Sequence, residues 1–303
     1  MKQLVKTIFV ALALSIACSA HAALSLFACE PEWAALAHEI GGDKVSIYAA
    51  TTALQDPHRI EARPSLIAKM RSADLVVCTG ADLEVGWLPL LIQTSGNNKV
   101  SSSQPGNFMA ADYVAKLEVP GAVDRSQGDI HPFGNPHVHL NPHNVERVAK
   151  ALSERLSKVD ASNAAYYAVR AKDFEARWQK ATADWEAKAA PLKGMKLVPY
   201  HKDEVYLIAW LGMVEETNIE PKPGIPPSAG HLSELLAKLK EQPADAITRG
   251  AYQDPKAPEW LSERTKIPAV MLPYTVGGTP EAKDLFGLFD DTIARLLKAR
   301  KPA

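Results

Sequence analysis

The sequence contains little cysteine and no excess of charge of either sign. Three cysteines in 303 residues are too few for a disulfide-stabilised scaffold. The 34 basic and 35 acidic residues give a formal net charge of −1, so the chain lacks the basic field that binds nucleic acid. It also lacks a phosphate-binding loop and the Gly-x-Ser-x-Gly and His-Glu-x-x-His motifs. We therefore expect no nucleic-acid partner, and no common hydrolase signature is present.

Hydrophobic runs are short, and the clearest one lies at the N-terminus. Two lysines precede an apolar segment at residues 8–17, and Ala20-His21-Ala22 fits a signal-peptide cleavage site. The apolar segment is shorter than the roughly 20 residues that span a membrane. Cys18 leaves a lipid anchor as the alternative, although the residues before it match the usual lipidation motif poorly. We expect residues 1–22 to be a signal peptide, cleaved after Ala22, and the mature protein to be soluble and exported.

Cleavage removes two lysines and leaves 32 basic against 35 acidic residues, a net charge of −3. It also leaves two cysteines, Cys29 and Cys78. Both lie near the ends of two strands that we expect to be neighbours. In an oxidising compartment such a pair is a disulfide candidate, with two buried free thiols as the alternative. We favour the disulfide.

Strand-like and helix-like segments alternate along the chain. Three apolar strands and two helices alternate within residues 24–79, and a similar pattern restarts after residue 191, so each half predicts a parallel sheet. Residues 161–189 contain no Gly or Pro and predict one helix of about 40 Å. A long surface helix on a single domain is the alternative to a connecting helix.

We therefore expect an α/β protein with two lobes, each a mainly parallel sheet flanked by helices, joined by one long rigid helix. The predicted boundaries are residues 23–159 for the N-terminal lobe, 160–190 for the linking helix and 191–303 for the C-terminal lobe. Trp178 and Trp185 are seven residues apart on this helix, which is typical of core packing on one face.

Five of the nine histidines lie between residues 131 and 201. His58 lies in the stiff turn Asp56-Pro57-His58, because proline restricts its own backbone and that of the residue before it. His201 directly follows a predicted strand, and the carboxyl ends of parallel strands face the ligand crevice in α/β proteins. Both histidines are therefore at expected site positions, one in each lobe.

Two more histidines, His137 and His139, are two residues apart. In an extended segment such residues project to the same side, so both are expected to face one site. Neutral imidazole is the commonest metal-ligand side chain, and three imidazoles with one further group suit tetrahedral Zn²⁺. The residues that we expect outside the site are His38, His143 and His231 at the surface or at helix ends, and Glu84 and Glu204 as solvated carboxylates. His131 is undecided.

Several motifs in this order resemble those of the periplasmic solute-binding proteins of zinc and manganese ABC importers. The resemblance covers nearly all of residues 24–303. The pieces that carry it are Asp56-Pro57-His58 with Pro64-Ser65, Ala73-Asp74-Leu75-Val76-Val77 with Gly80 and Glu84, Asn135-Pro136-His137 with Leu140-Asn141-Pro142, His201 with Tyr206, and Glu220-Pro221-Lys222-Pro223-Gly224-Ile225 with Pro227-Ser228.

The resemblance implies that His58, His137 and His201 are metal ligands. The family usually adds a carboxylate from a C-terminal loop, but residues 272–278 lack that aspartate. His139 stands where the family commonly has an aromatic residue, so we expect it as the fourth ligand. Water is an equal alternative, and Glu204 is a more remote one. A missing oxygen ligand favours Zn²⁺ over Mn²⁺, which prefers carboxylates.

The implied function is that of a carrier and not of an enzyme. We expect a monomer that captures Zn²⁺ between its lobes with small movements and delivers it to a membrane permease driven by a cytoplasmic ATPase. A zinc hydrolase is one alternative, since three histidines and a water also describe a catalytic site, with Glu204 as its general base. A metal-binding adhesin or sensor on the same scaffold is another.

Overall fold

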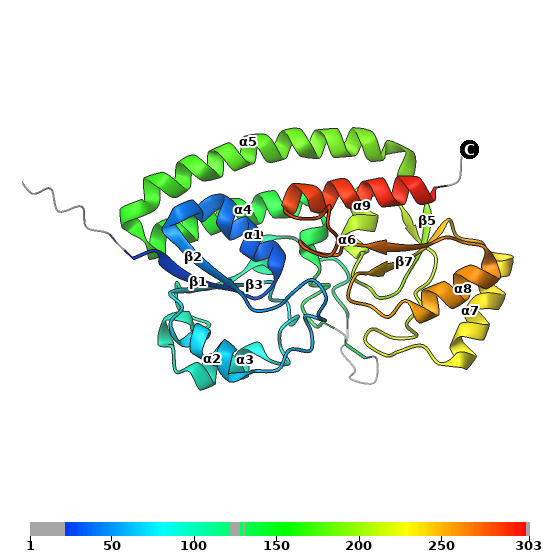
Figure 1. The fold of residues 1–303 in the computed structure, drawn as a ribbon, viewed down its shortest axis with the longest axis horizontal. Helices are drawn as coiled ribbons and strands as arrows, with labels where there is room; N and C mark the ends of the chain where they lie inside the picture. The colour runs from blue at the N-terminus through cyan, green and yellow to red at the C-terminus, as the bar shows by residue number, and fades with distance from the viewer. Residues whose placement is uncertain (1–21, 122–127, 130, 301–303) are drawn as a thin grey trace, which may run out of the picture.

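The computed structural model describes residues 22–121, 128–129 and 131–300. Residues 1–21 of the predicted signal peptide lie outside these ranges. The described chain forms two lobes beneath one long helix (Figure 1). In these ranges, no helix combines the length and the apolar character that crossing a membrane requires.

The N-terminal lobe is built on a parallel four-stranded sheet in the order β2-β1-β3-β4. All residues of β3 are buried, as expected for a parallel strand that is covered on both faces. The carboxyl ends of parallel strands lie at one edge of their sheet, and here this edge faces the cleft between the lobes. The strands are β1 (Leu24–Ala28), β2 (Val45–Ala49), β3 (Leu75–Cys78) and β4 (Asn107–Met109).

The C-terminal lobe repeats this arrangement. Its parallel sheet has the order β6-β5-β7-β8, in which each strand takes the place of its counterpart in the first lobe. The prediction of two mainly parallel sheets is confirmed. The strands are β5 (Lys196–Pro199), β6 (Val214–Glu215), β7 (Ala246–Gly250) and β8 (Ala269–Leu272).

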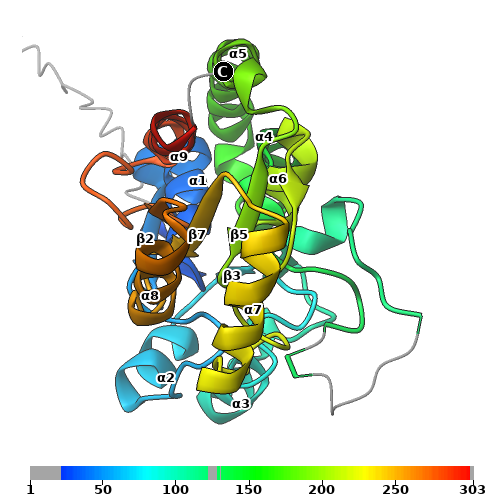
Figure 2. The ribbon, with the colours of Figure 1, turned by 90° about the vertical axis from the view of Figure 1, so that its right-hand side faces the viewer.

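Helices cover both sheets (Figures 1 and 2). On one side the layer contains α1 (Pro31–Gly41), α4 (Pro142–Val159), α6 (Val205–Leu211) and α9 (Leu285–Ala299). On the other side α2 (Pro64–Arg71) and α3 (Leu88–Ser95) lie under the N-terminal sheet, and α7 (Ala229–Glu241) and α8 (Lys256–Thr265) lie under the C-terminal sheet.

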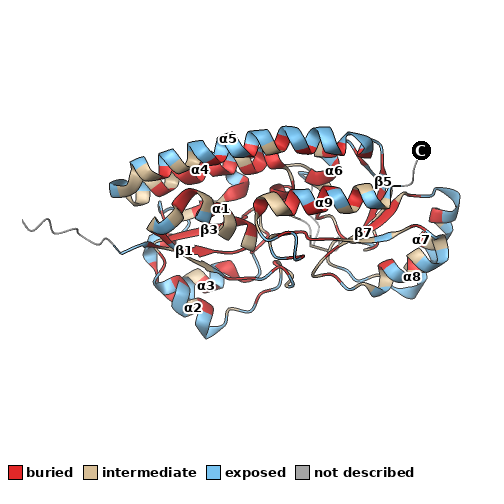
Figure 3. Ribbon diagram, turned by 45° about the horizontal axis from the view of Figure 1, so that its top comes forward, coloured by how far each residue is buried: buried red, intermediate tan, exposed pale blue. Residues whose placement is uncertain are grey.

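The long helix α5 (Ala164–Ala189) joins the two lobes, as predicted. Its 26 residues span about 39 Å, and it contacts α1 and α4 at one end and α9 at the other. One side is buried and the other exposed, as Figure 3 shows. It begins at Ala164 and not at residue 161, because residues 161–163 form a 3₁₀ turn.

The two tryptophans of α5 are part of the core, which confirms their prediction. The side chains of Trp178 and Trp185 are buried, and both rings pack on Phe289 of α9, with centroid distances of 5.5 and 4.9 Å. The main apolar core contains strand and helix residues from both lobes. A shared core of this kind resists independent movement of the lobes.

A disulfide joins Cys29 to Cys78, as favoured from the sequence. Cys29 directly follows β1 and Cys78 ends β3, and these strands are neighbours in the sheet. Their Cα atoms are 4.8 Å apart. The bond therefore links the carboxyl ends of two neighbouring strands of the N-terminal sheet.

Two helices, α3 and α8, were not expected from the sequence. Each has a proline in its first turn, Pro89 in α3 and Pro258 in α8. Proline is tolerated there because the first N–H groups of a helix have no partner inside the helix.

Candidate metal centre

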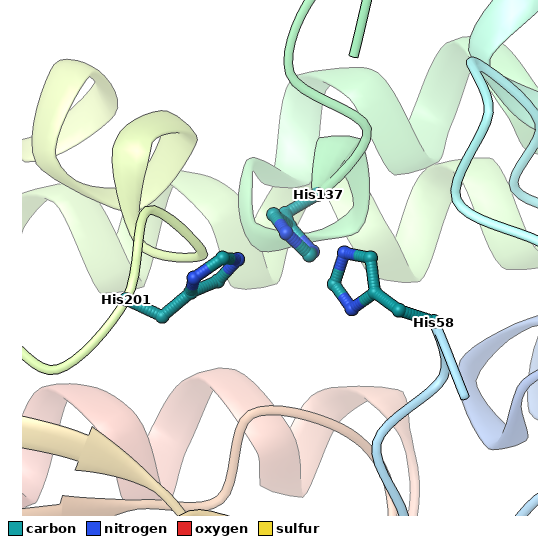
Figure 4. A group of neighbouring side chains, drawn as sticks. All are labelled: His58, His137 and His201. Atoms are coloured by element: carbon teal, nitrogen blue, oxygen red, sulfur yellow. The ribbon is translucent and has the colours of Figure 1, made fainter. Parts of the chain in front are cut away.

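Three histidines from three loops converge between the lobes (Figure 4). His58 lies between β2 and α2, His137 precedes α4, and His201 follows β5. Their ring centroids are 5.5 to 5.6 Å apart, and one ligand nitrogen of each lies within 4.8 Å of the other two. The structure thus brings together the three histidines that the resemblance implied.

Two of the three converging rings have a buried nitrogen that lacks a partner among the described residues. Nε2 of His58 and Nε2 of His137 are buried and accept or donate no hydrogen bond. A buried polar atom without a partner is costly, whereas a metal ion would bind the lone pairs of these nitrogens. The arrangement can therefore hold a cation through imidazole nitrogens.

Carboxylates hold the outer nitrogens of two of these rings. Nδ1 of His58 lies 2.8 Å from Asp56 Oδ1, and Nδ1 of His201 lies 2.7 Å from Glu220 Oε2. A carboxylate can accept the Nδ1 proton, which fixes the ring and leaves Nε2 free to bind a metal. The third ring differs, because Nδ1 of His137 lies 3.0 Å from the Tyr274 hydroxyl.

The surroundings of the site shift the pKa values of His201 and His137 in opposite directions. Burial lowers the pKa of His201, but the hydrogen bond to Glu220 and the nearby carboxylates Asp203 and Asp56 outweigh it, so its pKa is raised. Burial, followed by repulsion from His58 and His201, holds the pKa of His137 well below its usual value. Protons therefore compete with a metal more strongly at His201 than at His137.

His131, which the sequence left undecided, lies beside the group. Its ring centroid is 5.3 Å from that of His58 and 6.4 Å from that of His137. It hydrogen-bonds the backbone of Asp82, and its buried Nε2 has no partner among the described residues. Burial, then the charges of His58 and His201, lowers the pKa of His131 to about 4. A cavity of about 180 Å³ reaches from His131 to His137 and His201.

His139 does not join the group. The expectation of an extended segment was wrong, because residues Val138–Leu140 form a 3₁₀ turn. Three residues per turn rotate His139 away from the side on which His137 projects. Its Nε2 donates to the carbonyl oxygen of Tyr274 at 2.9 Å, and its Nδ1 lies 3.4 Å from Glu32 Oε1. Both nitrogens thus face groups other than the three converging rings.

The expectation that Glu84 and Glu204 are solvated was also wrong, because both are buried. The carboxylate of Glu84 accepts the backbone N–H groups of Thr79 and Gly80, and that of Glu204 accepts the Thr248 hydroxyl at 2.8 Å. Burial raises the pKa of Glu84 to about 7. Neither carboxylate belongs to the group of ligand atoms around the three histidines, so Glu204 is not placed as a fourth ligand or a general base there.

The sequence reading missed the residues that support the rings. Asp56 and Glu220 each precede a proline in the quoted motifs, and that shared pattern was an available signal. Tyr274 offered none, because it is 137 residues from the histidine that it contacts. His131 is in the histidine-rich stretch, but periodicity does not tell which of its rings face the cleft.

The chain matches the sequence profile of a family described as zinc-uptake complex component A, periplasmic (ZnuA), over residues 27–299. The manganese ABC transporter substrate-binding lipoprotein PsaA of Streptococcus anginosus is 25% identical over 256 residues, which cover 81% of this chain and 78% of PsaA. The iron ABC transporter substrate-binding lipoprotein MtsA of Streptococcus pyogenes serotype M1 is 26% identical over 240 residues, which cover 76% of this chain and 72% of MtsA.

Solved structures show the same fold. A crystal structure of ZnuA superposes with a TM-score of 0.76 at 20% identity and covers 92% of this chain and 100% of that chain. The likeness extends over both lobes and the long helix. The names of the matched proteins include zinc, manganese and iron, so the comparisons agree on a divalent metal and not on which one.

Proposed function

The chain belongs to the family of periplasmic zinc-uptake components, and on this premise we propose that it captures Zn²⁺ between its lobes for delivery to an importer. Members of the family are metal-binding components of ABC importers, which work with a membrane permease and an ATPase, and are not enzymes. The observation that carries the zinc proposal is the convergence of His58, His137 and His201, two of which, His58 and His137, have a buried Nε2 without a partner among the described residues.

The donor set favours zinc over manganese. The three converging groups are imidazoles, and the nearby carboxylates Asp56 and Glu220 bind ring nitrogens and do not join the group of ligand atoms. Imidazole suits Zn²⁺, whereas Mn²⁺ prefers oxygen ligands and binds more weakly to a given nitrogen site. The two supporting carboxylates also balance the charge of one divalent ion.

A fourth ligand completes a tetrahedral zinc site. His131 is our candidate for it, because its buried Nε2 is unpartnered among the described residues and its ring lies next to that of His58, although it lies outside the group of ligand atoms that the three histidines form. Water is the alternative. His139, the residue favoured from the sequence, is held by Glu32 and Tyr274 and is not retained as this ligand.

The remaining proposals concern the whole protein. We propose export to the periplasm with cleavage after Ala22, action as a monomer, and a division into lobes 23–159 and 191–303 with residues 160–190 as the linking helix. The shared core beneath α5 supports small lobe movements during capture and release.

Isothermal titration of the metal-free protein with Zn²⁺ and Mn²⁺ at pH 7.5 tests the function. We expect one site for Zn²⁺ with a Kd below micromolar, and at least about tenfold weaker binding of Mn²⁺. Zinc binding weaker than micromolar would overturn the proposal, and tighter binding of manganese would overturn its choice of metal. His131→Ala should weaken zinc binding if His131 is the fourth ligand, whereas the exposed His143→Ala should not.

A further inference from the structure

Tyr274 reaches across the cleft to a candidate ligand of the other lobe. It follows β8 in the C-terminal lobe, and its hydroxyl lies 3.0 Å from Nδ1 of His137 in the N-terminal lobe. Both side chains are buried, and their ring centroids are 5.8 Å apart in an edge arrangement. Of the three converging histidines, His137 is the one whose outer nitrogen faces a neutral group and whose support comes from the opposite lobe.

The backbone at Tyr274 is in a conformation that side chains rarely adopt. Its φ is +64°, and the N–H of Thr275 donates to the carbonyl of Pro273 at 2.8 Å. These features define a γ-turn with positive φ, which is rare and strained for a residue with a bulky side chain. Such strain persists where the surrounding structure holds it in place, and it is concentrated at functional sites.

Two buried contacts hold this turn against the N-terminal lobe. The carbonyl oxygen of Tyr274 accepts from Nε2 of His139 at 2.9 Å. The hydroxyl of Thr275 donates to Glu32 Oε2. His139, Glu32 and Thr275 are each at most 2% exposed, so these bonds are shielded from water. The turn is therefore anchored on both sides of the Tyr274 side chain.

We propose that Tyr274 is a positioning residue through which the C-terminal lobe orients His137 for metal binding. This inference rests on the proposed function. The hydroxyl accepts the Nδ1 proton of His137 and so directs the Nε2 lone pair of that ring to the metal. Because the hydroxyl belongs to the opposite lobe, the orientation of His137 depends on the contact between the two lobes. The neutral phenol adds no third negative charge to the two supporting carboxylates.

The test removes one oxygen atom. Tyr274→Phe keeps the ring and should weaken zinc binding about tenfold at pH 7.5, the lower end of the range for loss of a group that supports a metal ligand. Tyr252→Phe is the matched control, because Tyr252 is a neighbouring tyrosine whose hydroxyl contacts Asp203 and Gln253. This control should bind zinc as the unmodified protein does.

A second readout separates orientation from general packing. Co²⁺ bound to the unmodified protein and to the Tyr252→Phe protein should give the same visible absorption spectrum, whereas Tyr274→Phe should change its intensity and band positions because His137 is turned. Equal affinity and spectra in Tyr274→Phe and the unmodified protein would overturn the inference and leave the proposed function intact. Equal losses in both tyrosine variants would overturn it too, and absent zinc binding by the unmodified protein would overturn the function itself.

If Tyr274→Phe does not fold, NMR of the unmodified protein decides. In the zinc-loaded protein, Nδ1–H of His137 should exchange slowly with water and show a cross-peak to the ring protons of Tyr274. Loss of that signal into rapid exchange would contradict the inference.

Discussion

The two lobes have the same strand order but contribute different chemistry to the site. In the N-terminal lobe, the loops that follow β2 and β4 supply two candidate ligands, His58 and His137. In the C-terminal lobe, the counterpart loops after β6 and β8 supply the supports Glu220 and Tyr274, and the ligand His201 follows β5. The N-terminal lobe thus provides two of the three candidate ligands. The C-terminal lobe provides the third and two of the side chains that orient the ligand rings.

Beneath these loops, each lobe contains a similar buried hydrogen bond between a glutamate and a threonine. Glu30 accepts from the Thr79 hydroxyl at 3.2 Å in the first lobe, and Glu204 accepts from Thr248 at 2.8 Å in the second. Each bond ties the segment after the first strand of its lobe to the third strand or, for Thr79, to the residue that follows it. The scaffold is therefore common to both lobes, and the difference in function lies in the loops at the strand ends.

The largest effect is expected from removal of a ligand. His137→Ala in the first lobe and His201→Ala in the second should each weaken zinc binding about 1,000-fold. Binding of zinc to a four-ligand structural site contributes about 10–16 kcal/mol, so one ligand contributes up to about 4 kcal/mol, which corresponds to that factor in Kd. Competition with a chelator of known affinity measures the change. An unchanged affinity in the His201 variant would show that the N-terminal lobe binds the metal alone, which would break the account of a site shared between lobes.

The second prediction concerns Glu84 in the N-terminal lobe and Gln253 in the C-terminal lobe, each of which is replaced by the other residue type. Glu84 accepts the N–H of Gly80 after β3, and Gln253 accepts that of Gly250 at 2.7 Å at the end of β7, the third strand of the other lobe. Burial raises the pKa of Glu84 from 4.5 to about 7, so the folded protein binds more protons than the unfolded chain between these pH values. The contribution of Glu84 to the free energy of unfolding is therefore present below pH 4.5 and lost as the pH rises toward 7.

Glu84→Gln should remove this loss. Relative to the unmodified protein, its free energy of unfolding should rise by up to about 3 kcal/mol between pH 5 and pH 8. Denaturant unfolding of the metal-free proteins across that range measures the difference. Gln253→Glu should introduce the same loss in the other lobe, and parallel pH profiles of all three proteins would contradict the role of burial at this position.

The smallest effect is expected at Glu220. At pH 7.5, Glu220→Gln should weaken zinc binding about tenfold through loss of support for His201. In the unmodified protein the pKa of His201 is raised, so protons compete with the metal for this ring up to a higher pH than they would at an imidazole of ordinary pKa. The variant lowers that pKa, so its zinc affinity should begin to fall at a lower pH. Titrations between pH 5.5 and 8 measure this, and a constant ratio of the two affinities would contradict it.

The sequence was sufficient for features that depend on local pattern. The buried run of β3, the uninterrupted helix α5 and the spacing of its tryptophans predicted the two-lobed fold, and Cys29 and Cys78 predicted their bond through neighbouring strands. His58 and His201 were placed by the rule that the ends of parallel strands face the cleft.

The remaining features depend on local turns and on distant contacts. The 3₁₀ turn at Val138–Leu140 reversed the expected direction of His139, and alternation along the sequence does not reveal such a turn. Glu84 is buried, and its carboxylate is satisfied by backbone N–H groups of Thr79 and Gly80 after β3, which no sequence pattern reveals. The contact between Tyr274 and His137 joins two lobes, so no window along the chain contains it.

A crystal structure of the zinc-loaded protein, with anomalous scattering measured on both sides of the zinc absorption edge, tests the central claim most directly. We predict one zinc peak between the lobes, about 2.0–2.1 Å from Nε2 of His58, His137 and His201. A peak that is bound by residues of one lobe alone, or that is coordinated mainly by carboxylate oxygens, would contradict the account.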